Sequence, residues 1–275
     1  MRQPVLCAVM RILYIIFAAA LLAPALLWLG RFGVVKKRAA AVAAVLTLAI
    51  SGSLLLLAVL PGNSFYGSVV THASLRGQRK LAALTFDDGP YPPYTQQLLQ
   101  VLAEKKVRAT FFIVGENAVA APELLLAEQA AGHELALHAG WHRDFLKLDA
   151  GELAKNIAYG KSAVEKITGQ KPKYIRPPHG FKDWQAAQAV KAAGLQMVNW
   201  SVIPRDWTNP GAEIIARRVC GSVSPGAIIL LHDGDSPAKK APRQQTVEAA
   251  ALIIDRLRAE GYEFVTVSEL LAAGE

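Results

Sequence analysis

Seven short apolar runs, rich in β-branched and aromatic residues, follow one another from Lys80 onward, and helical stretches separate several of them. Their length is typical of buried strands, and they cover residues 81–86, 109–114, 134–137, 173–176, 196–202, 227–232 and 262–267. Strands that alternate with helices are typical of a parallel sheet, because parallel strands need a crossover between them. We therefore expect one α/β domain whose sheet closes into a barrel.

Signals for helix ends lie between these strands. Asp149 is followed by Glu152 three residues later, which is the pattern of a capping box. Gly194 and Gly261 stand where two helical patterns stop, as expected for a glycine just past a helix end. The predicted helices cover residues 95–106, 151–167, 184–193 and 245–260.

Two apolar stretches precede this domain. Residues 12–29 and 39–60 contain no charged side chain, and each is close to the roughly 20 residues that a membrane-spanning helix needs. A cleaved signal peptide is the alternative for the first stretch, with a conceivable site around Ala23 and Ala25. The second apolar stretch directly after it favours an anchor of two transmembrane helices.

The basic loop between the two stretches predicts the topology. Arg31 and Lys36 to Arg38 lie within it, and the positive-inside tendency places such a loop in the cytoplasm. Arg2, Arg11 and the basic residues at 76–80 compete with this orientation. We expect a multi-pass protein of the cell membrane, with residues 1–60 as anchor, 61–79 as linker and 80–275 as an extracytoplasmic domain.

Charge and cysteine usage exclude some classes of protein. The formal net charge is +8, but the first 60 residues hold six basic and no acidic side chains, so the rest of the chain has a net charge of only +2. This distribution excludes a nucleic-acid footprint. Cys7 and Cys220 are the two cysteines, and their separation indicates no disulfide framework. No protein partner is predicted.

Two adjacent carboxylates end the first predicted strand. Asp87 and Asp88 follow an apolar run, and Gly89-Pro90 break it. Alternating strand and helix folds place their chemistry at the carboxyl ends of strands. Two neighbouring carboxylates repel each other unless a cation lies between them or one is protonated. A plain Asp-Asp-Gly turn is the alternative for this pair alone.

A pair of histidines ends the third predicted strand. His138 and His142 are four residues apart, a spacing that can serve one metal ion but is weak by itself. With Asp88 they make a His-His-Asp set that leaves coordination positions open for water and substrate. Asp87 then remains available as a general base.

Three further strand ends carry polar residues. Arg176 lies beside two prolines that stiffen its loop, and its guanidinium suits a carboxylate, in a catalytic or in a purely structural ion pair. Asp206 and Trp207 follow the fifth strand, where a loop packed on the rim is the alternative. His232 ends an apolar strand and can protonate a leaving amine, although a structural histidine is the alternative there.

Taken together, the five stretches resemble the polysaccharide deacetylase family, the carbohydrate esterases with a NodB homology domain. The motifs are Thr-Phe-Asp-Asp at 85–88, His-Ala-Gly-Trp-His at 138–142, Arg-Pro-Pro at 176–178, Asp-Trp at 206–207 and Leu-Leu-His at 230–232, in the order of that family. The resemblance covers residues 80–270. It implies a distorted (β/α)7 barrel, which agrees with the seven strands predicted from the pattern.

The resemblance also implies roles for individual residues. It implies that Asp88, His138 and His142 bind a divalent metal, usually zinc, with cobalt or manganese as alternatives. It implies that Asp87 is the catalytic base and that Arg176 orients this base. It implies that His232 is the general acid and that Asp206 tunes this histidine. Trp207 and Leu230 would form the walls of the substrate pocket.

Two positions depart from the family pattern. Ala139 stands where a Ser or Thr usually follows the first metal-binding histidine, and His179 stands where an aromatic residue usually ends the Arg-Pro-Pro motif. The backbone amide at His179 is the part that is expected to bind the oxyanion, so the reaction should survive the change. His133 is interpreted as structural, and His72 carries no signal.

The predicted function is hydrolysis of the acetamide C–N bond of an N-acetylhexosamine-containing glycan, such as peptidoglycan, by a metal-dependent polysaccharide deacetylase. One alternative is a deacylase of a lipid-linked amino sugar at the membrane surface. A second alternative is a barrel that binds carbohydrate without catalysis. Retention of every proposed catalytic residue disfavours the last alternative, because binding alone needs neither Asp87 nor His232.

Overall fold

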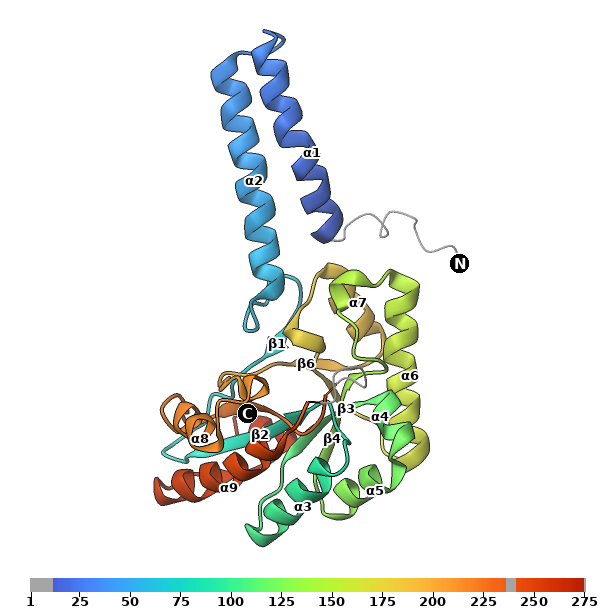
Figure 1. Cartoon of the computed structure of the whole chain (residues 1–275), viewed down its shortest axis with the longest axis vertical. Coiled ribbons are helices and arrows are strands. Elements are labelled where there is room, and N and C mark those ends of the chain that lie inside the picture. Colours follow the sequence, from blue (N-terminus) through green and yellow to red (C-terminus); the bar gives the residue numbers. More distant parts are fainter. Residues whose placement is uncertain (1–11, 236–240, 275) are drawn as a thin grey trace.

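The computed structural model describes residues 12–235 and 241–274 of the chain, so Arg2, Cys7 and Arg11 lie outside the described residues. Two long helices, α1 (Ile12–Arg31) and α2 (Lys37–Val59), form a hairpin that projects from the barrel (Figure 1). Both are long and apolar enough to cross a membrane, and only 17 % of the residues in each span are buried. The basic loop between them lies at the end of the hairpin that is far from the barrel.

The remaining chain forms a curled, parallel sheet. The strands are β1 (Val69–Val70), β2 (Leu81–Asp87), β3 (Thr110–Val114), β4 (Glu134–Ala139), β5 (Tyr174–Ile175), β6 (Gln196–Val198), β7 (Ala227–His232) and β8 (Glu263–Phe264). Their order is β1-β6-β5-β4-β3-β2-β7, and β8 also pairs with β2. Each predicted run contains a strand, and β1 adds an eighth in the stretch predicted as a linker. The predicted strand at 196–202 ends already at Val198.

The barrel is distorted because its two edges meet only through isolated bridges. Val202 pairs with Ile229 in parallel, and His72 pairs with Ala227 in antiparallel fashion. No continuous ladder joins β6 to β7 among the described residues. The predicted distorted α/β barrel is therefore confirmed in the form of a half-barrel with an irregular seam.

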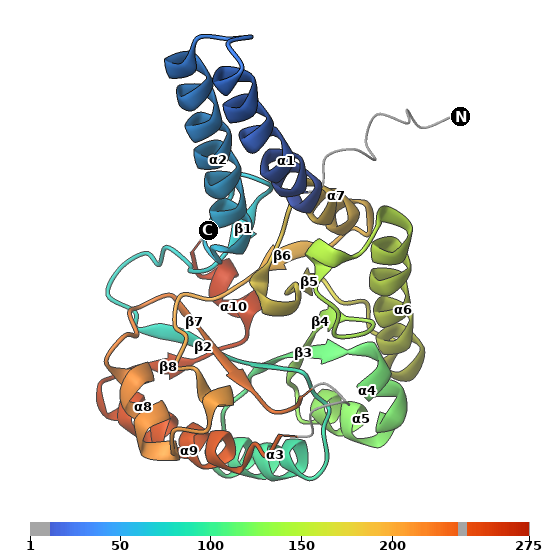
Figure 2. The same ribbon diagram turned by 45° about the horizontal axis from the view of Figure 1, so that its top comes forward.

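Helices cover the outside of this sheet (Figure 2). The predicted capping box is present, since Asp149 and Glu152 exchange hydrogen bonds of 2.8 and 3.0 Å. The predicted helices correspond to α3 (Tyr94–Glu104), α6 (Ala150–Thr168), α7 (Trp184–Ala192) and α9 (Gln244–Ala259). Four helices lie outside the predicted ranges: α4 (Gly115–Ala120), α5 (Pro122–Ala130), α8 (Ala212–Cys220) and α10 (Val267–Ala272).

The central strand β2 brings the polar rim together. All seven of its residues are buried, between β3 and β7 in the sheet and under a core that includes α3, α8 and α9. A strand covered in this way reads as a continuous apolar run. Its last residue, Asp87, stands in register with His232, the last residue of β7. The parallel strands thus deliver their polar ends to one edge of the barrel.

Candidate active site

Asp88 is held in an unusual backbone conformation directly after β2. Its φ angle is 77°, in the left-handed region that aspartate tolerates better than most residues. Asn117 Nδ2 donates a hydrogen bond of 2.7 Å to the Asp88 carbonyl oxygen. Gly234 packs against the same carbonyl so closely that a Cβ atom there would collide with it. The backbone turn at Asp88 is therefore held by Asn117 on one side and by Gly234 on the other.

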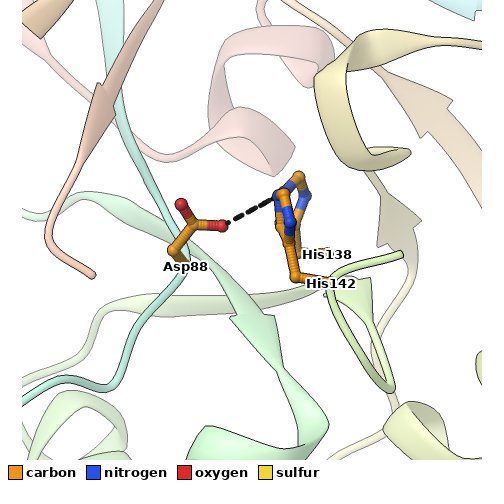
Figure 3. Close-up of side chains that lie close together, drawn as sticks. All are labelled: Asp88, His138 and His142. Carbon is orange, nitrogen blue, oxygen red and sulfur yellow. Dashed lines mark ion pairs between the residues drawn. The ribbon is translucent and has the colours of Figure 1, made fainter. Parts of the chain in front are cut away.

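The predicted His-His-Asp set is assembled in the structure (Figure 3). His138 lies in β4, and His142 lies in the loop that follows it. The Nε2 atoms of both imidazoles are 3.4 Å from Asp88 Oδ1, and the three ligand atoms lie within 4.8 Å of one another. Asp88 Oδ1 is buried and has no hydrogen-bond partner among the described residues. A cation between the three side chains would satisfy it.

The hydrogen bond behind His138 also fits a metal site. Its Nδ1 lies 2.7 Å from the carbonyl oxygen of Arg176, which can only accept, so Nδ1 carries the proton and Nε2 keeps its lone pair. Burial, His142 and Arg176 hold the pKa of His138 well below its usual value. The imidazole is therefore neutral, as a metal ligand must be.

Asp87 faces Arg176 in a buried ion pair. Arg176 Nη1 donates to Asp87 Oδ1 at 2.6 Å and to Thr85 Oγ1 at 2.8 Å. The guanidinium is fully buried and stacks on the ring of Phe112 at 3.9 Å. Its Nη2 donates to the carbonyl oxygen of Asn199 at 3.0 Å. Burial raises the pKa of Asp87 to about 6, although Arg176 opposes the rise.

His232 and Asp206 form a second pair across the pocket. His232 Nδ1 lies 2.9 Å from Asp206 Oδ1, and its backbone N–H donates to Asp206 Oδ2 at 2.9 Å. Thr246 Oγ1 donates to Oδ2 as well, at 2.9 Å. Burial alone would lower the pKa of His232, but the Asp206 carboxylate outweighs it and raises the pKa to about 9.

All ten predicted site residues come together. Asp87, Asp88, His138, His142, His179, Trp207, Leu230 and His232 line one pocket of about 540 Å³, and Arg176 and Asp206 lie behind its walls. Trp207 is 40 % exposed and meets the His232 ring edge-on at 5.2 Å. His133, predicted to be structural, is buried and is not among the pocket residues, and its Nδ1 accepts a hydrogen bond from the backbone of Ala109.

Several residues of the site were not predicted from the sequence. Thr85, the backbone carbonyl of Asn199 and Thr246 hold Arg176 and Asp206 in place. Thr85 lies within the first motif but was given no role, and nothing in the sequence pattern marks Asn199 or Thr246. Arg243 lines the pocket with a buried Nη1 that has no hydrogen-bond partner among the described residues. Other pocket residues without a prediction are Val59, Pro61, Phe181, Trp200, Ile203, Asp235 and Ala241.

Comparison with known proteins gives a consistent picture. The family model described as polysaccharide deacetylase matches residues 75–198. The chain is 41 % identical over 194 residues to a peptidoglycan-N-acetylglucosamine deacetylase of Bacillus cereus, an alignment that covers 70 % of this chain and 88 % of that protein. It is 37 % identical over 194 residues to a chitooligosaccharide deacetylase of Bradyrhizobium, covering 68 % and 89 %.

The fold is similar to that of solved structures as well. A crystal structure of a peptidoglycan N-acetylglucosamine deacetylase in complex with a substituted N-oxidanyl-benzamide superposes with a TM-score of 0.68 at 30 % identity. The superposition covers 74 % of this chain and 92 % of that one.

Proposed function

Because the chain belongs to the polysaccharide deacetylase family, we propose that it removes the acetyl group from N-acetylhexosamine units of a glycan by hydrolysis. The proposal depends above all on one observation. Asp87, paired with Arg176, and His232, paired with Asp206, end neighbouring strands at the pocket that also holds the His-His-Asp set. The relatives named for peptidoglycan and for chitooligosaccharides act on N-acetylglucosamine glycans by their names, and this supports the same sugar class here.

Asp88, His138 and His142 would hold a divalent metal ion. Two imidazoles and one carboxylate are a common catalytic ligand set for Zn²⁺, with Co²⁺ or Mn²⁺ as alternatives. When bound, such an ion supplies Lewis-acid polarisation of the amide carbonyl and makes water a better nucleophile. The unpartnered Oδ1 of Asp88 and the neutral His138 support this assignment.

Asp87 takes the role of general base. A carboxyl group with a pKa of about 6 is ionised at neutral pH and is a stronger base than an ordinary aspartate. Arg176 Nη1 holds Oδ1 of Asp87, and Oδ2 lies 3.9 Å from His138 Nδ1, so Oδ2 is the oxygen left to take a proton. Asp87 removes a proton from the water that attacks the acetamide carbonyl carbon.

His232 takes the role of general acid. With a pKa of about 9 its imidazole is protonated at neutral pH, and Asp206 keeps it oriented. As the C–N bond breaks, His232 gives its proton to the nitrogen, which leaves as the free amine while the acyl carbon leaves as acetate. The backbone amide of His179 would stabilise the oxyanion, a contact worth about 3–4 kcal/mol. Leu230 and Trp207 would enclose the acetyl methyl group.

We also propose that the hairpin of α1 and α2 anchors the chain in the membrane. With it we propose residues 1–60 as anchor, 61–79 as a linker that also contributes β1 to the sheet, and 80–275 as catalytic domain. The exposed apolar surface of both helices supports it. The barrel would then lie outside the cytoplasm, where peptidoglycan is found.

Acetate release by the purified full chain in detergent micelles tests the function. Oligomers of N-acetylglucosamine and isolated peptidoglycan are offered after chelator treatment, with and without added zinc. We expect release from at least one substrate that is lost with the chelator and restored by zinc. Absence of acetate from both, with one zinc bound per chain, would contradict the proposal for these two glycans and leave the lipid-linked amino sugar as the alternative substrate.

A further inference from the structure

The end of the second candidate span is part of the pocket wall. Val59, the last residue of α2, and Pro61 just beyond it line the same pocket as Asp87 and His232. In both ribbon views α2 runs down to the rim of the barrel rather than ending at a distance from it (Figures 1 and 2). The pocket and the apolar helix therefore share a boundary.

Lys182 holds the C-terminal end of α2 against the barrel, and we call this contact the junction. Its backbone N–H donates to the carbonyl oxygen of Ala58 at 3.0 Å, and its Nζ donates to the carbonyl oxygens of Leu60 at 2.9 Å and Pro61 at 3.3 Å. The side chain is fully buried. A cation at the C-terminus of a helix satisfies its last carbonyl groups and interacts favourably with its dipole. The Tyr66 hydroxyl adds a hydrogen bond of 2.9 Å to the Leu54 carbonyl oxygen.

A chain of hydrogen bonds leads from the junction to the proposed base. Asn199 Nδ2 donates to the Pro61 carbonyl oxygen at 2.9 Å. The carbonyl oxygen of Asn199 accepts from Arg176 Nη2 at 3.0 Å, and Arg176 holds Asp87. The barrel is thus attached to α2 at a fixed place beside its catalytic centre, and no free spacer separates the two.

This attachment sets the height of the pocket above a membrane. The 23 residues of α2 give a helix about 35 Å long, which is enough for a hydrocarbon core of about 30 Å. If Val59 marks the edge of that core, the pocket lies at the level of the headgroups, a layer roughly 5–7 Å thick. Leu60, Ile203 and Trp207 are each at least 40 % exposed near this level. Exposed apolar and indole side chains are typical of a membrane interface.

We propose that the substrate is an N-acetylated amino sugar attached to a membrane lipid, presented to the pocket from the headgroup layer beside α2. This inference rests on the proposed deacetylation and narrows its substrate class. A lipid-linked sugar is confined to the plane in which the pocket lies, so its effective concentration there is high. Val59 and Pro61 line the pocket where α2 ends, so the pocket is bordered directly by the proposed membrane anchor.

The test compares two substrates on the full, zinc-loaded chain in lipid nanodiscs. One substrate is N-acetylglucosamine joined through a diphosphate to a polyprenol in the same bilayer, and the other is the water-soluble tetramer of N-acetylglucosamine. We expect kcat/KM to be at least tenfold higher for the lipid-linked sugar. Equal or faster hydrolysis of the tetramer would overturn the inference and leave the proposed function intact. Acetate from neither substrate would contradict the proposed function itself.

A substitution at the junction tests whether α2 presents the substrate, independently of the hydrolytic reaction itself. Lys182→Met should lower kcat/KM for the lipid-linked sugar about tenfold and change that for the tetramer less than twofold, because Lys182 holds the end of α2 but does not itself line the pocket. Lys155→Met, an exposed lysine on α6, is the matched control and should change neither. Equal losses on both substrates, or no loss on either, would show that the junction does not present the substrate.

Tyr66→Phe covers the case in which Lys182→Met fails to fold. It removes a single hydroxyl whose partner belongs to α2. We expect the same selective loss on the lipid-linked sugar, about twofold to fivefold, with an unchanged melting temperature. An unchanged ratio between the two substrates in this variant would count against the inference.

Discussion

At the scale of single residues, the pocket holds two adjacent aspartates with different surroundings. Asp87 is neutralised by a buried arginine, whereas Asp88 Oδ1 faces two imidazoles and has no hydrogen-bond donor among the described residues. The two adjacent carboxylates are therefore suited to different roles, Asp87 as a base and Asp88 as a metal ligand. Substitutions of the same kind at these two positions should fail in different ways.

We expect Asp87→Asn to keep one bound zinc ion and lose turnover by about 10²–10⁴-fold, the usual contribution of a general base. Asp88→Asn should instead lose zinc, because an amide oxygen is a poorer ligand than a carboxylate. Zinc per chain by atomic spectroscopy and acetate release measure both. Asp87→Asn also removes the countercharge of the buried Arg176, so the free energy of unfolding of this variant should be lower by about 3–5 kcal/mol. Full activity in Asp87→Asn would refute its assignment as the base.

The pair of His232 and Asp206 predicts a pH dependence. The general acid works only when protonated, so kcat/KM should fall as pH rises through the His232 pKa of about 9. In Asp206→Asn the carboxylate that raises this pKa most is gone while burial remains, so the pKa should fall from about 9 toward the ordinary 6.5, with Asp88 and Asp87 still raising it. At pH 8 the protonated fraction, and with it kcat/KM, should then fall severalfold, up to about 30-fold where the pKa reaches 6.5. An alkaline limb that stays near pH 9 in this variant would contradict the prediction. Asp255→Asn, at an exposed position of α9, is the control.

At the scale of elements, α6 positions the loop that carries His142. Asn156 Oδ1 accepts hydrogen bonds from the backbone N–H groups of Gly140 and Trp141, at 2.6 and 3.1 Å, and its Nδ2 donates to the Trp141 carbonyl oxygen. Gly160 on the same helix packs against the strand end, where a Cβ atom would lie 2.7 Å from the Ala139 carbonyl oxygen. The helix and the metal-ligand loop therefore fit together without spare room.

Gly160→Ala should push α6 away from this loop. We expect a loss of about 1–3 kcal/mol from overpacking, a melting temperature lower by several degrees, and weaker zinc binding as His142 moves. Gly151→Ala on the same helix is the matched control, because its nearest new contact would be 3.4 Å away. Its effect should be neutral or slightly stabilising. Equal melting temperatures and zinc affinities for the two variants would show that the close approach is unimportant.

Some elements with strong local signals were predicted, although the amphipathic helix α8 was missed, and the contacts between distant segments were not predicted. The capped helix α6 and the buried strand β2 follow from pattern alone. In contrast, α4 and α10 have six residues each, too few to show a helical period. The residues that brace the site depend on segments far apart in the chain, such as Asn199 with Pro61. No local sequence pattern indicates such contacts. The polar residues at the strand ends could therefore be predicted, but the residues that hydrogen-bond to them could not.

At the scale of the whole molecule, the polar and apolar parts are arranged along one axis. The basic loop lies at the far end of the helical hairpin, and the barrel with its nearly neutral charge lies at the other end. The two ends of α2 thus differ sharply: Lys37 and Arg38 begin the helix, and no acidic or basic side chain lies in its last turn. This asymmetry predicts an orientation in the membrane as well as an anchor.

A C-terminal fusion to alkaline phosphatase, which is active only outside the cytoplasm, should be active, and a fusion to a green fluorescent protein should be dark. Replacing Lys36, Lys37 and Arg38 together by serine should lower the phosphatase activity severalfold, because the loop then loses most of the charge that keeps it in the cytoplasm. The same replacement at Lys155, Lys166 and Lys171, within the barrel domain, should leave it unchanged, since large domains translocate largely regardless of charge. A fluorescent, phosphatase-inactive parent chain would place the barrel in the cytoplasm, and a cell-wall substrate would then be impossible.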